Sequence, residues 1–401
     1  RRYFYIFFWL LISYIFDRYY QDKLIIKNSD LIYQITTSIK SIIIFGAVIL
    51  LYNWFLGNYL SRTYLFTFLS VIFLLSTITQ YYLNKIFSKA LSANKYWTLL
   101  DNCNIREYFN DNCFLNQNKI KIKYIKNINQ NIEKIEMSNG LIVKDFDKLS
   151  SDDLEILLKF KRKGKKIYKL SNWLRIFIKS YPPNIIDKRD FLELNFISIN
   201  NSLQMRLKRA GDILVSIFII FFSLPLFLLF GILIFIEDRG PIFYSQKRSG
   251  YLGEVFTVWK LRSMKVDSEK KGLRWSRKND PRITKVGKFI RKTRIDELPQ
   301  LWSVFNGDMS LIGPRPERPE FDKLLAEKIP FYSMRYLLRP GLSGWAQVNY
   351  PYTSSVQEST NKLSLDLYYV ANYSIFLDLS IFLKTLRLIF NLKSSKIYSS
   401  T

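Results

Sequence analysis

The residues best suited to chemistry are concentrated between positions 280 and 316. Two adjacent carboxylates, Asp296 and Glu297, lie there among several arginines. Arginine binds phosphate oxygens through paired donors, and a carboxylate can hold Mg²⁺ together with substrate phosphate. A second carboxylate can attack phosphorus and form an acyl phosphate. The stretch therefore predicts a site that handles a diphosphate and a hard metal ion.

The same two acids also have a purely structural explanation. Asp296 and Glu297 come just before Pro299, and proline and acidic residues both favour the first turn of a helix. Helix starts of this kind are common. Adjacent positions do not share a helix face, so two functional acids here would differ in role rather than act as an equivalent pair.

Composition excludes several kinds of chemistry. The 401 residues include no histidine, which rules out histidine general bases, histidine zinc sites and Ser-His-Asp catalysis. Lys and Arg number 60 against 33 Asp and Glu. This excess reflects either biased composition or an anionic partner. No nucleic acid is predicted as that partner, because no nucleic-acid-binding motif is present.

The elements that must position these residues begin with apolar segments. The run Tyr3–Phe16 is shorter than the roughly 20 residues that a bilayer span needs, and since the sequence does not start with Met we expect it to begin inside a transmembrane helix. The runs Ser41–Leu56 and Tyr64–Leu83 can each cross as a helix. Lysines after the last run place the following segment on the cytoplasmic side. Residues 1–92 are therefore predicted to be transmembrane.

Residues 93–204 are typical of a small soluble α/β domain. We expect strands at Ile120–Ile125 and Gly140–Val143 and a helix over Ser151–Phe160, capped by Ser150 or Ser151. No glycine-rich nucleotide loop is present. The segment is therefore predicted to be an accessory domain.

A further apolar run, Ile213–Ile236, is long enough to span a membrane but contains Ser223 and Pro225 near its centre. Proline removes one helix hydrogen bond and clashes with the preceding turn. The run is therefore either a kinked span, which is the more common outcome, or a re-entrant helix that leaves by the face it entered. Near the end of the chain, Asp378–Asn391 has the pattern of an amphipathic helix on a membrane or a core.

Six sequence blocks between residues 205 and 395 carry a resemblance. They are KRAGD at 208–212, RGPIFYSQKRSG at 239–250, FTVWKLRSM at 256–264, DPRITKVGKFIRKTRIDELPQLWSVFNGDMSLIGPRPE at 280–317, RPGLSGWAQVN at 339–349 and LDLYYVANYSIFLDL at 365–379. In this order they resemble the bacterial sugar transferase family, the polyprenyl-phosphate phosphoglycosyl transferases. The N-terminal spans and linking domain resemble the long members of that family.

The resemblance implies a fold. The family's core is monotopic and enters the membrane by a re-entrant helix broken near a Ser-Pro pair, here 208–237 with Pro225 at the break and Ser223 displaced by one position. We therefore expect an α-rich membrane protein with α/β parts. Its expected domains are transmembrane helices 1–92, a soluble α/β domain 93–204, a monotopic catalytic domain 205–395 with amphipathic surface helices, and a tail 396–401.

The resemblance also implies a reaction. Asp296 matches the family's nucleophile, which attacks the sugar-side phosphorus of a UDP-sugar and expels UMP. Glu297 matches the acid that binds Mg²⁺. A polyprenyl phosphate then receives the hexose-1-phosphate, and glucose, galactose and N-acetylated hexoses all fit this pattern. The residues expected to bind the substrate phosphates are Lys260, Arg262, Arg282, Arg291 and Arg315. The role of Asp366, which also lies in a matching block, is left open.

The expected partners are a UDP-sugar donor, an undecaprenyl phosphate acceptor and the membrane. The expected location is the bacterial inner membrane, with the catalytic domain on the cytoplasmic face and a product that starts exopolysaccharide, capsule or O-antigen synthesis. A homo-oligomer is left open. The alternative is a catalytically inactive membrane scaffold or regulator on the same fold, against which the intact acid pair and its arginines count. A transporter is disfavoured by too few spans.

Overall fold

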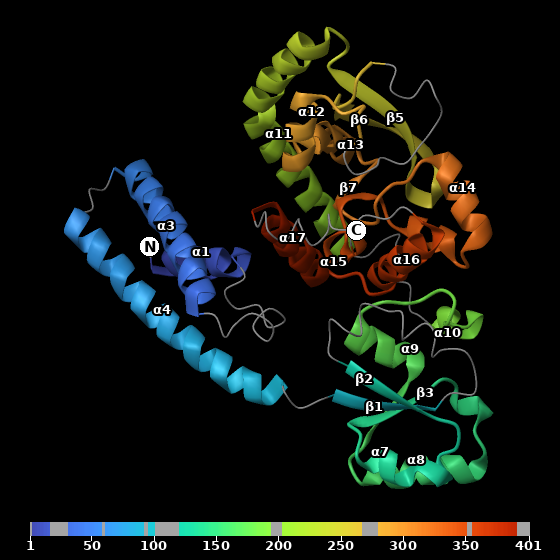
Figure 1. Ribbon diagram of the computed structural model, residues 1–401. Coiled ribbons are helices and arrows are strands. Elements are labelled where there is room, and N and C mark those ends of the chain that lie inside the picture. The colour runs from blue at the N-terminus through green and yellow to red at the C-terminus, as the bar shows by residue number, and fades with distance from the viewer. Residues whose placement is uncertain are drawn as a thin grey trace. The chain divides into compact units, whose positions relative to one another are not determined.

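The structure is a computed structural model. It describes residues 2–16, 31–57, 61–91, 95–100, 120–193, 203–266, 280–350 and 355–390, so the expected tail 396–401 lies outside the described residues. The chain divides into two compact units, Arg1–Ile178 and Lys179–Thr401. Both are rich in helix (Figure 1).

Three helices, α1 (Arg2–Ile15), α3 (Leu31–Phe55) and α4 (Arg62–Leu91), open the first unit. Their contacts centre on buried apolar side chains such as Phe45 and Ile49, while most of their other large apolar side chains are exposed. Two stretches, Thr37–Phe55 and Arg62–Tyr82, are long and apolar enough to cross a membrane; the apolar part of α1 is shorter. An apolar outer surface on helices of this length is what a bilayer requires.

The rest of the first unit is an α/β fold. Strands β1 (Lys95–Leu100), β2 (Ile120–Ile125), β3 (Gly140–Val143) and β4 (Lys166–Lys169) form a parallel sheet in the order β2-β1-β3-β4. Figure 1 shows helices on both faces of this sheet, and they are α7 (Ile132–Glu136) and α8 (Ser151–Arg162) on one face and α9 (Leu170–Trp173) on the other.

Local predictions for this part of the chain are confirmed. Strands β2 and β3 have the bounds expected from sequence. Helix α8 begins where expected, because the Ser150 hydroxyl accepts the backbone N–H of Asp153 at 3.2 Å. The sheet buries Leu141 and Val143 against Leu157 of α8, which gives the domain its own core.

The second unit contains the predicted site. An antiparallel hairpin of β5 (Phe243–Ser249) and β6 (Val255–Leu261) packs beside α12 (Lys285–Thr293), the 3₁₀ helix η5 (Ile295–Gln300) and α13 (Leu301–Asn306). Strand β7 (Ser310–Ile312) pairs in parallel with β8 (Gly341–Ser343). Further helices of this unit are α10 (Lys188–Glu193), η4 (Tyr251–Gly253), α14 (Pro319–Lys328), η6 (Tyr332–Leu337), α15 (Trp345–Asn349), α16 (Val356–Ala371) and α17 (Ile375–Phe390).

Helix α11 (Leu203–Asp238) differs from the expected broken helix. Helical structure continues through Pro225, which lies inside the helix. Proline removes only its own N–H from the helix, and the hydroxyl of Ser223 donates to the carbonyl of Ile220 at 2.9 Å in the preceding turn. The helix bends along its length without interruption (Figure 1). It is the third stretch that is long and apolar enough to cross a membrane.

Helix α17 has its charged side chains turned inward. Lys384 donates to the side chain of Asn349 at 2.9 Å and lies over the ring of Trp345, and Arg387 is buried. Phe376 is 84% exposed and Leu379 is 53% exposed. The helix starts at Ile375, three residues before the expected Asp378. Its outer face is apolar, whereas an amphipathic helix exposed to water turns its polar face outward.

Candidate active site

A turn at the end of α12 brings the predicted residues together. Thr284 caps the start of α12, since its hydroxyl accepts the N–H of Gly287, and Arg294 follows the last residue in the left-handed conformation (φ 61°). The chain then turns directly into η5, which carries Asp296 and Glu297 and packs against β6. Lys260 comes from β6, and Arg315 from the loop that follows β7.

Glu297 is the centre of a cluster of positive charge. Its Oε1 lies 2.7 Å from Arg315 Nη2, 3.1 Å from Lys260 Nζ and 3.7 Å from Arg294 Nη1. Burial alone would raise the pKa of Glu297, but the charges of Arg315 and Lys260 hold it well below its ordinary value. Glu297 is therefore ionised at neutral pH and organises the cations around it.

Asp296, the adjacent acid, lies in a different environment. It is 6% exposed, and its Oδ1 has no hydrogen-bond partner among the described residues. Burial, and next the charge of Glu297, raise the pKa of Asp296 from 3.8 to about 6, against the opposing charges of Lys260, Arg294 and Arg291. A buried carboxylate oxygen that is unpaired and weakly stabilised is suited to nucleophilic attack.

The helix-start explanation of these acids accounts for their place but not for their contacts. Asp296 and Glu297 do lie in the first turn of η5, and Pro299 lies inside it. However, no side chain caps this turn, and the carboxylate of Glu297 contacts the side chains of Lys260 and Arg315 instead of backbone N–H groups. Both features hold together: the turn presents the acids, and the surrounding cations set their charge states.

Buried charged side chains support the loop that carries Arg315. Prolines on both sides of Arg315 keep the segment from pairing as a regular helix or strand, and side chains donate to the carbonyls of Arg315 and Pro316. Arg335 Nη2 donates to the carbonyl of Arg315 at 2.8 Å, and Arg248 Nη1 donates to that of Pro316 at 3.1 Å. Arg335, which is 4% exposed, also donates to Asp366 at 2.9 Å.

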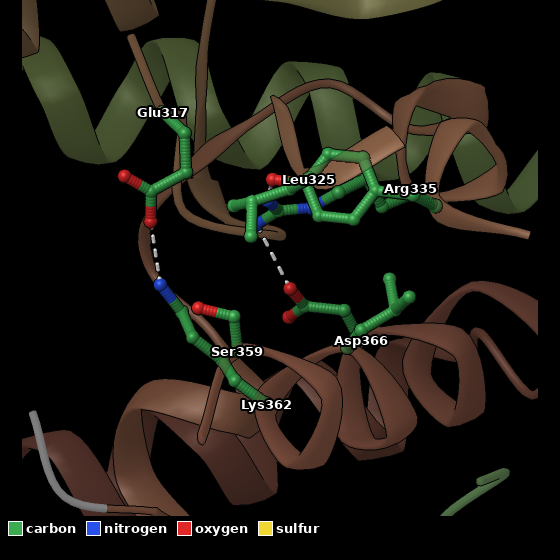
Figure 2. A pocket seen from close by; sticks show the side chains of 8 residues that line it. Glu317, Leu325, Arg335, Ser359, Lys362 and Asp366 are labelled. Carbon is green, nitrogen blue, oxygen red and sulfur yellow. Dashed lines mark hydrogen bonds and ion pairs between the residues drawn. The ribbon is translucent and has the colours of Figure 1, made fainter. Parts of the chain in front are cut away.

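Figure 2 shows this support around a small pocket, where Glu317 faces Lys362 and Arg335 faces Asp366. Lys362 Nζ donates to Glu317 at 2.6 Å. Against the effect of burial, Lys362 and Arg335 lower the pKa of Glu317 to about 2. The cavity has a volume of about 10 Å³, room for about one water molecule, and its charged side chains position the Arg315 loop through Arg335.

The other predicted residues lie in two kinds of environment. Arg291 lies close enough to lower the pKa of Asp296, so it belongs to the site. Arg262 is 7% exposed and lies 3.5 Å from Asp238 at the end of α11. Arg282 donates to Asp280 at 2.6 and 2.9 Å. The structure therefore places these last two arginines outside the cluster around Glu297.

Sequence analysis missed the supporting residues Arg248, Glu317, Arg335 and Lys362. One signal was present for the three cations: a Pro-Arg-Pro segment cannot pair as a regular helix or strand, so its carbonyls need donors from elsewhere. Which cations supply those donors depends on the fold, because they lie on β5, η6 and α16.

Known proteins match most of the second unit in sequence. A sequence model described as "Bacterial sugar transferase" matches residues 203–392. An Aeromonas hydrophila protein named UDP-N-acetylgalactosamine-undecaprenyl-phosphate N-acetylgalactosaminephosphotransferase is 45% identical over 183 residues, which are 46% of this chain and 43% of that protein. A Bacillus subtilis putative undecaprenyl-phosphate N-acetylgalactosaminyl 1-phosphate transferase is 48% identical over 139 residues, 35% of this chain and 78% of that protein.

A third relative carries a different sugar in its name. The UDP-glucose:undecaprenyl-phosphate glucose-1-phosphate transferase of Escherichia coli is 36% identical over 177 residues, 44% of this chain and 38% of that protein. The matches to the Aeromonas and Escherichia proteins thus span less than half of their length. The family match covers residues 203–392, which include both acids and all the predicted phosphate-binding residues.

Proposed function

Because this chain belongs to the bacterial sugar transferase family, we propose that it transfers a sugar-1-phosphate from a UDP-sugar to undecaprenyl phosphate and releases UMP. The observation that carries the proposal is the contrast between the two adjacent acids. Asp296 is buried with an unpaired oxygen, while Glu297 is held ionised by Lys260 and Arg315. One acid is thereby suited to attack and the other to hold positive charge.

The proposed reaction has two displacements at one phosphorus. An oxygen of Asp296 attacks the sugar-side phosphorus and forms an O–P bond, while the bond from that phosphorus to the bridging oxygen breaks and its electron pair leaves with UMP. An oxygen of the lipid phosphate then attacks the same phosphorus, and the carboxylate of Asp296 leaves with its electron pair. Neither step needs a proton transfer, so a chain without histidine can perform both.

Mg²⁺ fits the residues present if the substrate supplies most of the ligands. Among the described residues, no three Cys, Asp or Glu side chains converge as a preformed cage. Mg²⁺ is commonly held by one or two carboxylates together with substrate phosphates. The three cations contact Oε1 of Glu297, so Oε2 is the atom that we propose for the ion. When bound, Mg²⁺ would neutralise charge on the diphosphate.

We propose that α11 is re-entrant, so that the second unit stays on one side of the membrane. Near the start of the helix, Lys208 donates to the carbonyl of Ile312 at 2.9 Å and Arg209 donates to that of Val304. At its other end, Glu237 accepts the N–H groups of Lys285 and Val286. A helix that crossed the bilayer would carry one of these ends away from the unit. Its exposed Phe and Leu side chains, and those of α17, would face lipid.

Cysteine labelling tests this topology. In a background with both native cysteines replaced by serine, Gln204→Cys marks the first turn of α11 and Lys247→Cys marks β5, which follows its other end. We expect a membrane-impermeant maleimide to label both positions in inside-out vesicles and neither in right-side-out vesicles. Labelling of the two positions from opposite sides would show a full span. Labelling of both only from outside would overturn the proposed cytoplasmic location at the inner membrane.

The first displacement is expected to slow in acid. The raised pKa of Asp296, about 6, leaves the carboxyl protonated at lower pH, and only the ionised form attacks. The second-order rate constant for the single burst of UMP, measured at low donor concentration, should therefore rise with pH and level off above about 6. The assay omits the lipid, so each enzyme reacts once, because a phosphate monoester also titrates near pH 6. A flat profile from pH 5 to 8 would contradict the assignment.

The donor is proposed to be UDP-N-acetylgalactosamine, since the relatives named for that sugar are 45% and 48% identical and the Escherichia coli glucose transferase is 36% identical. The test is UMP release by lipid-embedded protein with Mg²⁺, undecaprenyl phosphate and a panel of UDP-sugars. Release with UDP-N-acetylgalactosamine supports the whole proposal, and release with another donor corrects the sugar. No release with any donor from folded protein favours an inactive scaffold.

A further inference from the structure

Gln300, at the last position of η5, has a buried amide without a partner. The side chain is 5% exposed, and its Nε2 makes no hydrogen bond to any described residue. Native proteins rarely leave a buried donor unpaired, because the group has lost its water. Such a group needs either an ordered water or a ligand. Because Gln300 lies on the same short helix as the two acids, a ligand is the better explanation than a water molecule.

Gln300 lies on the same face of η5 as Glu297. It follows Glu297 by three positions within the six residues of this 3₁₀ helix, and side chains three residues apart eclipse in a 3₁₀ helix. The element thus holds two buried unpartnered atoms, the acceptor Asp296 Oδ1 and the donor Gln300 Nε2. A phosphoryl group held between Asp296 and the cations around Glu297 would have non-bridging oxygens on the face that carries this donor.

We propose that Gln300 is a further catalytic residue, whose Nε2 donates a hydrogen bond to a non-bridging oxygen of the phosphoryl group in transfer. This inference rests on the proposed function. Lys260 and Arg315 already supply positive charge through their contacts with Glu297. A neutral amide adds a directed donor on the Glu297 face of η5 without stabilising the diphosphate so strongly that the product is retained. Fixed donors aimed at developing charge are among the largest catalytic effects.

Gln300→Met tests the inference, because methionine keeps the length of the side chain and removes the donor. We expect kcat for UMP formation to fall about 10- to 100-fold, with a smaller change in KM. The melting temperature should stay the same or rise, since an unpaired buried amide is replaced by an apolar group. A residue with only a structural role would not separate activity from stability in this way.

Two further variants complete the test. Gln347→Met makes the same change at a glutamine whose amide donates to the carbonyl of Leu342, and it should retain wild-type kcat. Gln300→Glu keeps the shape and replaces the donor with a negative charge, so it should also be slow even if the methionine variant folds poorly. Wild-type kcat in either Gln300 variant, or a loss that only follows the fraction unfolded, overturns this inference alone. Wild-type protein that releases no UMP overturns the proposed function as well.

Discussion

Asp296→Asn is expected to lower UMP release by about 10⁴-fold or more, because an amide does not replace a carboxylate nucleophile and the later steps depend on the first. The protein should remain folded. The pKa of Asp296 is raised from 3.8 to about 6, so above pH 6 its ionised form is less stable in the folded chain than in the unfolded one. At about 1.36 kcal/mol per pKa unit, removing the charge raises the free energy of unfolding by about 3 kcal/mol at most.

The measurement pairs activity with thermal unfolding at pH 7. Wild-type protein incubated with donor and no lipid should gain the mass of one phosphosugar, and the Asp296→Asn variant should gain none. The matched control is Asp187→Asn, which makes the same change at an exposed aspartate of the same unit and should retain full activity. An Asp296→Asn variant that still forms the adduct would move the nucleophile to another residue.

The apolar helices and the acid cluster could be predicted because their signals are local or strongly patterned. Uninterrupted apolar runs predict α3, α4 and α11 without knowledge of their contacts. The sequence also selected Lys260 and Arg315, which the structure brings to the same oxygen of Glu297. These residues lie far apart in the chain, so their meeting came from the resemblance and not from spacing.

Arg262 and Arg282 show what charge and motif leave undecided. The resemblance implies that both bind substrate phosphates, which stays a prediction. In the structure one lies by Asp238 at the end of α11, and the other pairs with Asp280 two positions earlier. In a chain this basic, an arginine's partner is decided by tertiary packing or by its nearest acid. Sequence cannot separate these cases from a substrate contact.

Gln300 and the helix α11 show a second limit. A neutral glutamine carries no charge signal, and its significance appears only when burial and hydrogen bonding are known. The resemblance implies a break at Pro225, but proline costs a helix only one hydrogen bond and a local clash. The rest of a long apolar helix, held by contacts at both ends, is enough to keep it continuous.

Glu297→Gln is expected to lower activity by about 10³-fold and also to lower the melting temperature, the opposite stability change from the adjacent acid. The variant leaves Lys260 and Arg315 without their shared counter-charge at 3.1 and 2.7 Å. Breaking a buried ion pair costs about 3–5 kcal/mol. These two cations keep 20% and 26% exposure, so solvent screening reduces the expected loss to about 1–3 kcal/mol. The Mg²⁺ concentration needed for residual activity should rise.

The pH dependence of stability gives an independent check on Glu297. Its folded pKa is held well below the ordinary value, so the stabilisation is complete above the unfolded pKa and is lost as pH falls through the folded one. The stability difference between wild type and Glu297→Gln should therefore shrink in acid. Lys260→Met with Glu297→Gln closes a double-mutant cycle. If the two losses simply add, Glu297 does not organise Lys260, and its effect on activity must come through the metal ion or Arg315.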